Sequence, residues 1–136
     1  MPSSRSPSQN KKYRILVVDD EPDVAQSVSS ILEKMYDVDI LTHPINALDH
    51  FRADRYDLVL LDYKMPKVDG FQLYRYLKRI DPALTICFMT AYEIFESQQE
   101  KEEFEKLSPP VDANCIIKKP FTKQVLLEKI QQLLSS

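Results

Sequence analysis

The stretch that decides the fold is residues 15–22, which read ILVVDDEP. Its first half is a run of four apolar residues, which is typical of a central strand in a parallel sheet covered on both faces. Its second half places three carboxylates directly after that strand and ends on Pro22, a residue favoured at the first position of a helix. The stretch therefore predicts a strand, an acidic turn and a helix in immediate succession.

Further apolar runs predict four more strands. Residues 58–61 and 85–89 are almost wholly apolar, residues 115–117 resemble them, and residues 38–41 form a weaker, edge-like run. Between the strands, apolar residues recur at the spacing of helices. These are Val24, Val28, Ile31, Leu32 and Met35, then Ala47, Leu48 and Phe51, then Phe71, Leu73, Leu77 and Ile80, and finally Leu126, Leu127, Ile130, Leu133 and Leu134.

These four helices, and a fifth in the polar stretch between the fourth and fifth strands, alternate with five strands and predict an α/β fold. Right-handed crossovers and the chain length favour a flavodoxin-like, doubly wound parallel sheet with five strands in the order 2-1-3-4-5. Helices on both faces make it a three-layer sandwich. Residues 1–12 are almost wholly polar and are predicted to be a disordered tail, so residues 13–136 form the single domain.

The composition argues against several classes of protein. A net charge of −3 gives no overall field that favours nucleic acid or an anionic membrane surface. No stretch approaches the ~20 apolar residues of a membrane span, and residues 1–12 have no signal-peptide core, so we expect a cytoplasmic protein. Cys87 and Cys115 lie in apolar contexts and are expected to be buried thiols. The single glycine, Gly70, excludes a glycine-rich phosphate loop and is expected to need a positive φ.

Chemically active side chains follow four of the predicted strands. Parallel strands gather ligands at their carboxyl ends. The first strand is followed there by Asp19, Asp20 and Glu21, the third by Asp62, the fourth by Thr90 and the fifth by Lys119. Each residue alone has an ordinary explanation, because aspartates after a strand often form a turn and a helix N-cap. Their convergence on one crevice favours a functional site.

The chemistry of that set indicates phosphoryl transfer. Asp19, Asp20 and Asp62 would repel one another, and a hard divalent cation such as Mg²⁺ relieves that repulsion. Asp62 can then act as a carboxylate nucleophile and form an acyl phosphate. Lys119 would neutralise charge, and Thr90 would donate to a phosphoryl oxygen.

The chain resembles the receiver domain of two-component response regulators. The motifs that carry the resemblance are residues 17–22 (VVDDEP), 61–70 (LDYKMPKVDG), 89–91 (MTA) and 119–122 (KPFT). The resemblance implies that Asp62 is the phosphorylated residue, that Asp20 and Asp62 bind Mg²⁺ directly, and that Asp19 acts through water. It also implies a metal-binding backbone carbonyl at Lys64, contacts from Thr90 and Lys119 to the phosphoryl group, and a cis peptide before Pro120.

Three departures from the family pattern are visible. Ile116 stands where the family often has an aromatic residue whose inward swing reports activation, so the aromatic half of that switch is in doubt. Lys64 and Tyr92 occupy positions that tune hydrolysis of the acyl phosphate, and their bulk and charge are expected to slow it. Residues 96–103 contain no apolar side chain, so the acidic segment 96–106 is either a solvated face or a partner-facing surface.

The leading hypothesis is a phosphoacceptor domain of a two-component phosphorelay. A sensor histidine kinase would phosphorylate Asp62 with Mg²⁺, and the product would switch a surface that binds a downstream protein or a fused output domain. Catalysis would be limited to the domain's own phosphotransfer and slow dephosphorylation, so it is not expected to be an enzyme in the usual sense. We expect a monomer or weak homodimer without nucleic-acid or membrane binding.

Two alternatives belong to other classes of protein. One is a receiver-like interaction or scaffold domain with a degenerate switch, which Ile116 and the 96–106 segment would permit. The other is a haloacid-type hydrolase that uses Asp62 as its nucleophile. The hydrolase is disfavoured because Lys64 stands where a second catalytic aspartate would be needed.

Overall fold

The sheet has the predicted order of strands. The computed structural model describes residues 12–46, 49, 51–65, 68–90, 98–99, 102 and 116–135. Its main sheet consists of β1 (Arg14–Val18), β2 (Asp37–Leu41), β3 (Leu58–Asp62), β6 (Thr85–Thr90) and β7 (Ile116–Lys118). These strands lie in the order β2-β1-β3-β6-β7, and every neighbouring pair is parallel. The predicted doubly wound, flavodoxin-like sheet is therefore confirmed.

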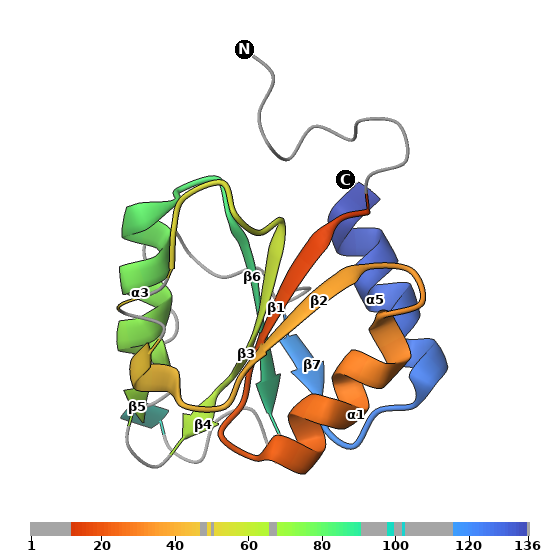
Figure 1. Cartoon of the computed structure of the whole chain (residues 1–136). Helices are drawn as coiled ribbons and strands as arrows, with labels where there is room; N and C mark the ends of the chain where they lie inside the picture. The colour runs from red at the N-terminus through yellow and green to blue at the C-terminus, as the bar shows by residue number, and fades with distance from the viewer. Residues whose placement is uncertain are drawn as a thin grey trace.

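Helices cover both faces of the sheet and complete three layers (Figure 1). α3 (Gly70–Ile80) covers one face, while α1 (Pro22–Leu32) and α5 (Lys123–Ser135) cover the other. A short 3-10 helix, η1 (Pro44–Asn46), follows β2. Three of the five predicted helices thus lie in the described residues. The second predicted helix, at Ala47 and Leu48, and the one between β6 and β7 fall largely outside them.

The two sheet faces bury separate cores, which explains the continuously apolar strands. Side chains alternate along a strand, so Val59 and Leu61 pack toward α3, while Leu58 and Leu60 pack toward α1 and α5. All four are fully buried. Each such side chain contributes roughly 1.5–3 kcal/mol relative to exposure. Cys87 belongs to the second core and is buried, as predicted, whereas Cys115 lies outside the described residues.

The first helix is shorter than its apolar spacing predicts. α1 ends at Leu32, and Met35 lies beyond it with 53% of its surface exposed. The Tyr36 amide donates to the Leu32 carbonyl at 2.9 Å, and Asp37 then begins β2 beside Arg14. The chain therefore turns back to form the edge strand before the helical pattern is complete.

A two-stranded ribbon follows the central strand, and the sequence patterns do not predict it. β4 (Lys64–Met65) pairs antiparallel with β5 (Val68–Asp69), and α3 begins at Gly70. The expected positive φ of Gly70 is wrong. A Cβ at this position would instead lie 2.8 Å from the backbone oxygen of Tyr63. The ribbon brings α3 so close to the residue after β3 that only glycine fits without a shift.

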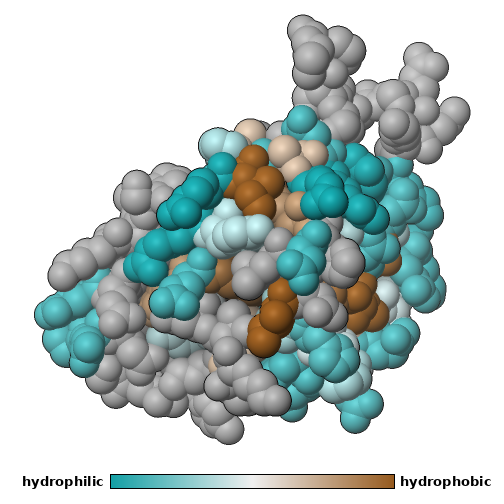
Figure 2. Space-filling view, turned by 60° about the vertical axis from the view of Figure 1, so that its left-hand side comes forward, coloured by the Kyte–Doolittle hydropathy of each residue, from teal (hydrophilic) through white to brown (hydrophobic). Residues whose placement is uncertain are grey.

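The coloured surface on the α3 side is mostly hydrophilic (Figure 2). Hydrophobic residues reach this face only in small groups separated by hydrophilic ones. Within the described ranges, no helix is both long enough and apolar enough to cross a membrane.

Candidate functional site

Four carboxylates gather at the carboxyl end of the sheet. Asp19, Asp20 and Glu21 follow β1 directly, and Asp62 is the last residue of β3. β1 and β3 are neighbours in register, with Val18 opposite Leu61, so the two strand ends meet. One oxygen from each of the four residues lies within 4.8 Å of the others. The predicted convergence of Asp19, Asp20 and Asp62 is therefore present in the structure.

The four carboxylates differ sharply in their exposure. Asp19 is completely buried and Asp62 is 5% exposed, while Asp20 is half-buried and Glu21 is exposed. A buried carboxylate is stable only with charged or hydrogen-bonding partners. The group thus has a buried anionic part, Asp19 and Asp62, and a more exposed acidic part, Asp20 and Glu21.

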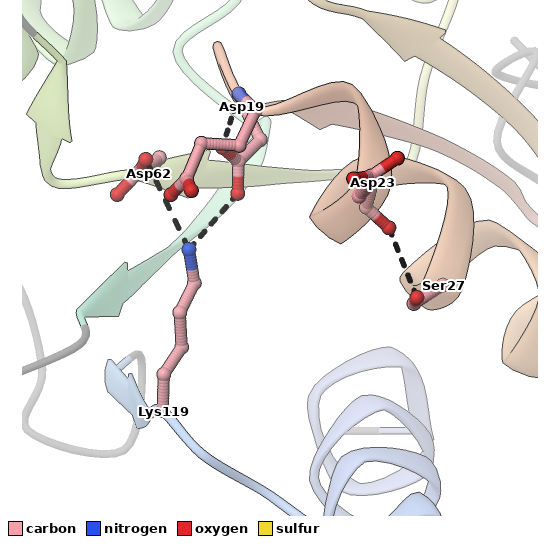
Figure 3. Close-up of polar contacts among 6 residues, drawn as sticks. Asp19, Asp23, Ser27, Asp62 and Lys119 are labelled. Atoms are coloured by element: carbon pink, nitrogen blue, oxygen red, sulfur yellow. Dashed lines mark hydrogen bonds and ion pairs between the residues drawn. The ribbon is translucent and has the colours of Figure 1, made fainter.

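Lys119 extends from the end of the edge strand β7 toward Asp19 and Asp62 (Figure 3). Its Nζ lies 2.9 Å from Asp19 Oδ2 and 3.9 Å from Asp62 Oδ2. The lysine follows β7 directly. The peptide between Lys119 and Pro120 is cis, as the resemblance to receiver domains implied. Its side chain is only 12% exposed, which strengthens the charge-assisted bond to Asp19.

Asp19 organises both the start of α1 and the position of the lysine. Its Oδ1 accepts the Glu21 amide proton at 3.0 Å, and its Oδ2 accepts from Lys119. The Asp19 amide in turn donates to the Leu41 carbonyl at 3.1 Å. Glu21 is the extended N-cap residue, and its own side chain does not cap the helix. Asp19 thus fixes the turn that holds the acidic residues together.

The remaining candidate residues are only partly described. Thr90 ends β6 and pairs in register with Lys118, and Lys64 begins β4 opposite Asp69. The side chains of Thr90 and Lys64 fall outside the described part, as does all of Tyr92. Ile116 is half-buried and packs against the α3-side core.

The donor set fits a hard divalent cation. Carboxylate oxygens are the ligands that Mg²⁺ prefers, and the group offers four of them. Lys119 brings one positive charge to this group. The group keeps a net negative charge, and a divalent cation would neutralise most of it. The sequence places Glu21 directly after Asp20, but the predicted cation site includes only Asp19, Asp20 and Asp62; the structure adds the Glu21 carboxylate to the group.

Comparisons with known proteins point to a single family. A family model described as a response regulator receiver domain matches residues 15–131. The chain is 34% identical over 124 residues to the sensor protein EvgS of Escherichia coli K12, a match covering 90% of this chain and 10% of that protein. It is 33% identical over 96 residues to sporulation initiation phosphotransferase F of Bacillus subtilis 168, covering 70% of this chain and 77% of that protein.

A solved structure agrees as well. The CheY-like response regulator receiver domain protein of Methanospirillum hungatei JF-1 matches with a TM-score of 0.74 and 28% identity. The match covers 92% of this chain and 95% of that one. The chain therefore spans nearly all of this structural relative but only about a tenth of EvgS.

Proposed function

This chain belongs to the response regulator receiver domain family, and we propose on this premise that Asp62 accepts a phosphoryl group from a sensor histidine kinase. One observation carries the proposal. Asp62 is a buried carboxylate at the end of the central strand, grouped with three others and 3.9 Å from the Lys119 ammonium. Such a carboxylate is held in place as a nucleophile, and the charges around it suit an incoming phosphate.

The reaction is a displacement at phosphorus. An oxygen of Asp62 forms the new P–O bond as the P–N bond of a phosphohistidine breaks, and the imidazole leaves after taking up a proton. Lys119 neutralises the oxygens of the transferred group, and Thr90 donates a hydrogen bond to one of them. Asp20, Asp62 and the Lys64 backbone carbonyl would hold Mg²⁺, with Asp19 acting through water. The bound cation would supply the remaining charge neutralisation.

Lys119 can respond to phosphorylation of Asp62 by changing its ion-pair partner. In the present structure Lys119 lies closer to Asp19 than to Asp62, at 2.9 Å against 3.9 Å. Phosphorylation adds about −1.5 to −2 charges on the Asp62 side, which draws the ammonium toward the new group. Because Lys119 follows β7, this shift would reach that edge of the sheet and the surface that a downstream protein or output domain binds.

Two positions are proposed to set the lifetime of the product. Lys64 and Tyr92 follow Asp62 and Thr90 by two residues, and their side chains would shield the acyl phosphate from water. Replacing them by Lys64→Asn and Tyr92→Ala should shorten the half-life of the phosphorylated protein. Unchanged decay in both variants would contradict this assignment.

A scaffold domain with a degenerate switch is the second candidate. It is favoured by Ile116, whose aliphatic side chain packs against the core that contains Phe88 and has no ring to rotate. The two candidates differ in whether the domain needs phosphate, since a scaffold needs none.

Because a histidine kinase draws its phosphate from ATP, the proposed phosphoacceptor function also implies a cytoplasmic domain.

The test is phosphorylation by a small donor. The full chain is incubated with Mg²⁺ and acetyl phosphate, and intact mass spectrometry should show one added phosphoryl group. Asp62→Asn should abolish it, whereas Asp23→Asn, which removes an acidic side chain nearby on α1, should retain it. Equal labelling of wild type and Asp62→Asn would reject Asp62 as the acceptor.

A further inference from the structure

Glu21 lies in the carboxylate group, but no step of the proposed reaction uses it. It is the N-cap residue of α1, with φ −97° and ψ 106°, and its side chain makes no capping hydrogen bond. Its amide is instead held by Asp19 Oδ1 at 3.0 Å. One of its carboxylate oxygens lies within 4.8 Å of oxygens of the other three acidic residues. The Glu21 carboxylate thus lies with the other acidic groups and makes no capping bond to the helix.

We infer that Glu21 is a further carboxylate ligand of the divalent cation held by this group of carboxylates, and that it raises the affinity of the site for the cation. The inference rests on the proposed function, because it takes the cation site from there. Glu21 would then bind the cation directly, in addition to Asp20, Asp62 and the Lys64 carbonyl and to the water-mediated contact of Asp19.

The engagement of Asp19 supports this inference. Both of its oxygens already accept hydrogen bonds, one from the Glu21 amide and one from Lys119. It is also completely buried. These bonds hold Asp19 in place, consistent with its proposed action on the cation through water alone. Glu21 is then the remaining carboxylate of the group beside Asp20 and Asp62.

The exposure of Glu21 supports the inference as well. Because Glu21 is exposed, it can move onto a cation from the solvent side without the cost of burying a charge. Without a cation, its charge only adds to the repulsion among the four carboxylates. A position that is unfavourable alone and favourable with a cation is the pattern of a ligand.

A simpler explanation is that a negative charge at this position only stabilises the N-terminus of α1. Asp23 provides the matched comparison, because it is also acidic and lies in the first turn of the same helix. Its carboxylate is not part of the four-residue group, and its carbonyl accepts the Ser27 hydroxyl at 2.9 Å (Figure 3). If helix electrostatics alone were at work, Glu21 and Asp23 should behave alike.

The test is calorimetric titration of the full chain with MgCl₂. Glu21→Gln keeps the length of the side chain and removes its charge, and should weaken Mg²⁺ binding by about 3- to 10-fold, as expected for one charge near a divalent ion in partly screened water. Glu21→Asp keeps the charge on a shorter arm and should lie between. Asp23→Asn should change the affinity by less than about twofold, because its charge lies outside the group. The rise in Tm on adding Mg²⁺ should follow the same order.

Each outcome has a defined consequence. Equal affinity losses in Glu21→Gln and Asp23→Asn would overturn the inference, and so would a Glu21→Asp variant that binds as tightly as wild type. Either result leaves the proposed function intact as long as wild type binds Mg²⁺ and Asp62→Asn binds it poorly. A wild-type chain that binds no Mg²⁺ would instead remove the metal site and the proposed function with it.

Discussion

Both ends of the sheet bury carboxylates, but they use them in opposite ways. At the amino end, Asp57 and Arg14 exchange two hydrogen bonds, from the Arg14 amide to Asp57 Oδ2 and from the Asp57 amide to the Arg14 carbonyl, each at 2.8 Å. At the carboxyl end, oxygens of four acidic residues gather within 4.8 Å of one another, and Lys119 lies against two of these residues, Asp19 and Asp62. The first arrangement completes backbone hydrogen bonding, and the second concentrates negative charge.

A second buried acid at the amino end follows the same rule as Asp57. Asp81 Oδ2 accepts the Asp54 amide at 3.0 Å, and Asp54 has a φ of 64°, in the left-handed region. Such a carboxylate stabilises a loop that needs an acceptor. Burial of an aspartate is therefore no mark of a site by itself. What distinguishes the carboxyl end is that acidic side chains from two strand ends converge.

The largest effect is expected from removing the positive charge of Lys119 at the carboxyl end. Lys119→Met should lower the free energy of unfolding by about 3 kcal/mol without Mg²⁺, because the fully buried Asp19 loses its charged partner. Urea unfolding measures this. Lys118→Met removes the same charge from the neighbouring, exposed residue and should change stability by less than about 0.5 kcal/mol. Equal losses in both variants would show that the ion pair contributes nothing specific.

The amino end should respond in stability alone. Asp57→Ala should lower the free energy of unfolding by about 1–3 kcal/mol, because the Arg14 amide loses its side-chain acceptor. Asp57→Asn retains an acceptor oxygen and should recover most of the loss. Labelling of the folded Asp57→Ala protein by acetyl phosphate should match wild type. A clear fall in labelling would break the proposed division between the two ends.

Close packing behind the carboxyl end gives a smaller prediction. In Gly70→Ala, the new Cβ would meet the Tyr63 backbone oxygen at 2.8 Å, and the resulting shift should cost about 1–2 kcal/mol. Helix propensity by itself would favour alanine by about 1 kcal/mol. A loss of stability in this variant would therefore come from the steric contact with Tyr63. Gln72→Ala, at an exposed position of the same helix, should be nearly neutral in thermal unfolding. A stabilised Gly70→Ala protein would show that the ribbon can move aside.

Much of this contrast could be read from the sequence. Continuous apolar runs predict the strands, and the parallel order they imply brings Asp19, Asp20 and Asp62 to one end, as the structure shows. The patterns could not show which acid pairs with Lys119. Asp19 and Asp62 lie at the ends of neighbouring strands and differ only in their distance from the lysine ammonium. They also missed the ribbon of β4 and β5, whose strands have two residues each and no periodicity to detect.

The role of Gly70 shows why such gaps arise. From sequence, a lone glycine before a helix suggested a special backbone angle, which is the commonest reason for the residue. The actual reason is contact with Tyr63, seven positions earlier, and only the folded ribbon creates that contact. Likewise, the bond between Asp57 and Arg14 joins residues 43 positions apart, and no local pattern reports it. Distances of this kind are decided by tertiary structure.

The edge of the sheet supplies the smallest effect, and it depends on pH. The Tyr56 hydroxyl donates to Asp39 Oδ2 at 2.7 Å, and burial, followed by this bond, raises the pKa of Tyr56 from 10.0 to about 12. The folded state therefore favours the neutral phenol. Its contribution is fully present below pH 10 and is lost as the pH rises from 10 through 12.

Tyr56→Phe isolates that contribution. It should cost about 1 kcal/mol at pH 8, where the hydrogen bond is intact. Above pH 10 the cost should shrink and then reverse, because wild type must either bury a phenolate or hold its proton against the solvent. The pKa of Tyr36 is also raised, by burial and by Tyr13, but both residues are common to the two proteins, so their effect cancels in the difference. Urea unfolding of both proteins between pH 8 and 11.5 measures it. A difference that stays constant over this range would mean that the bond to Asp39 does not hold the phenol proton, and that the edge strand is secured by packing alone.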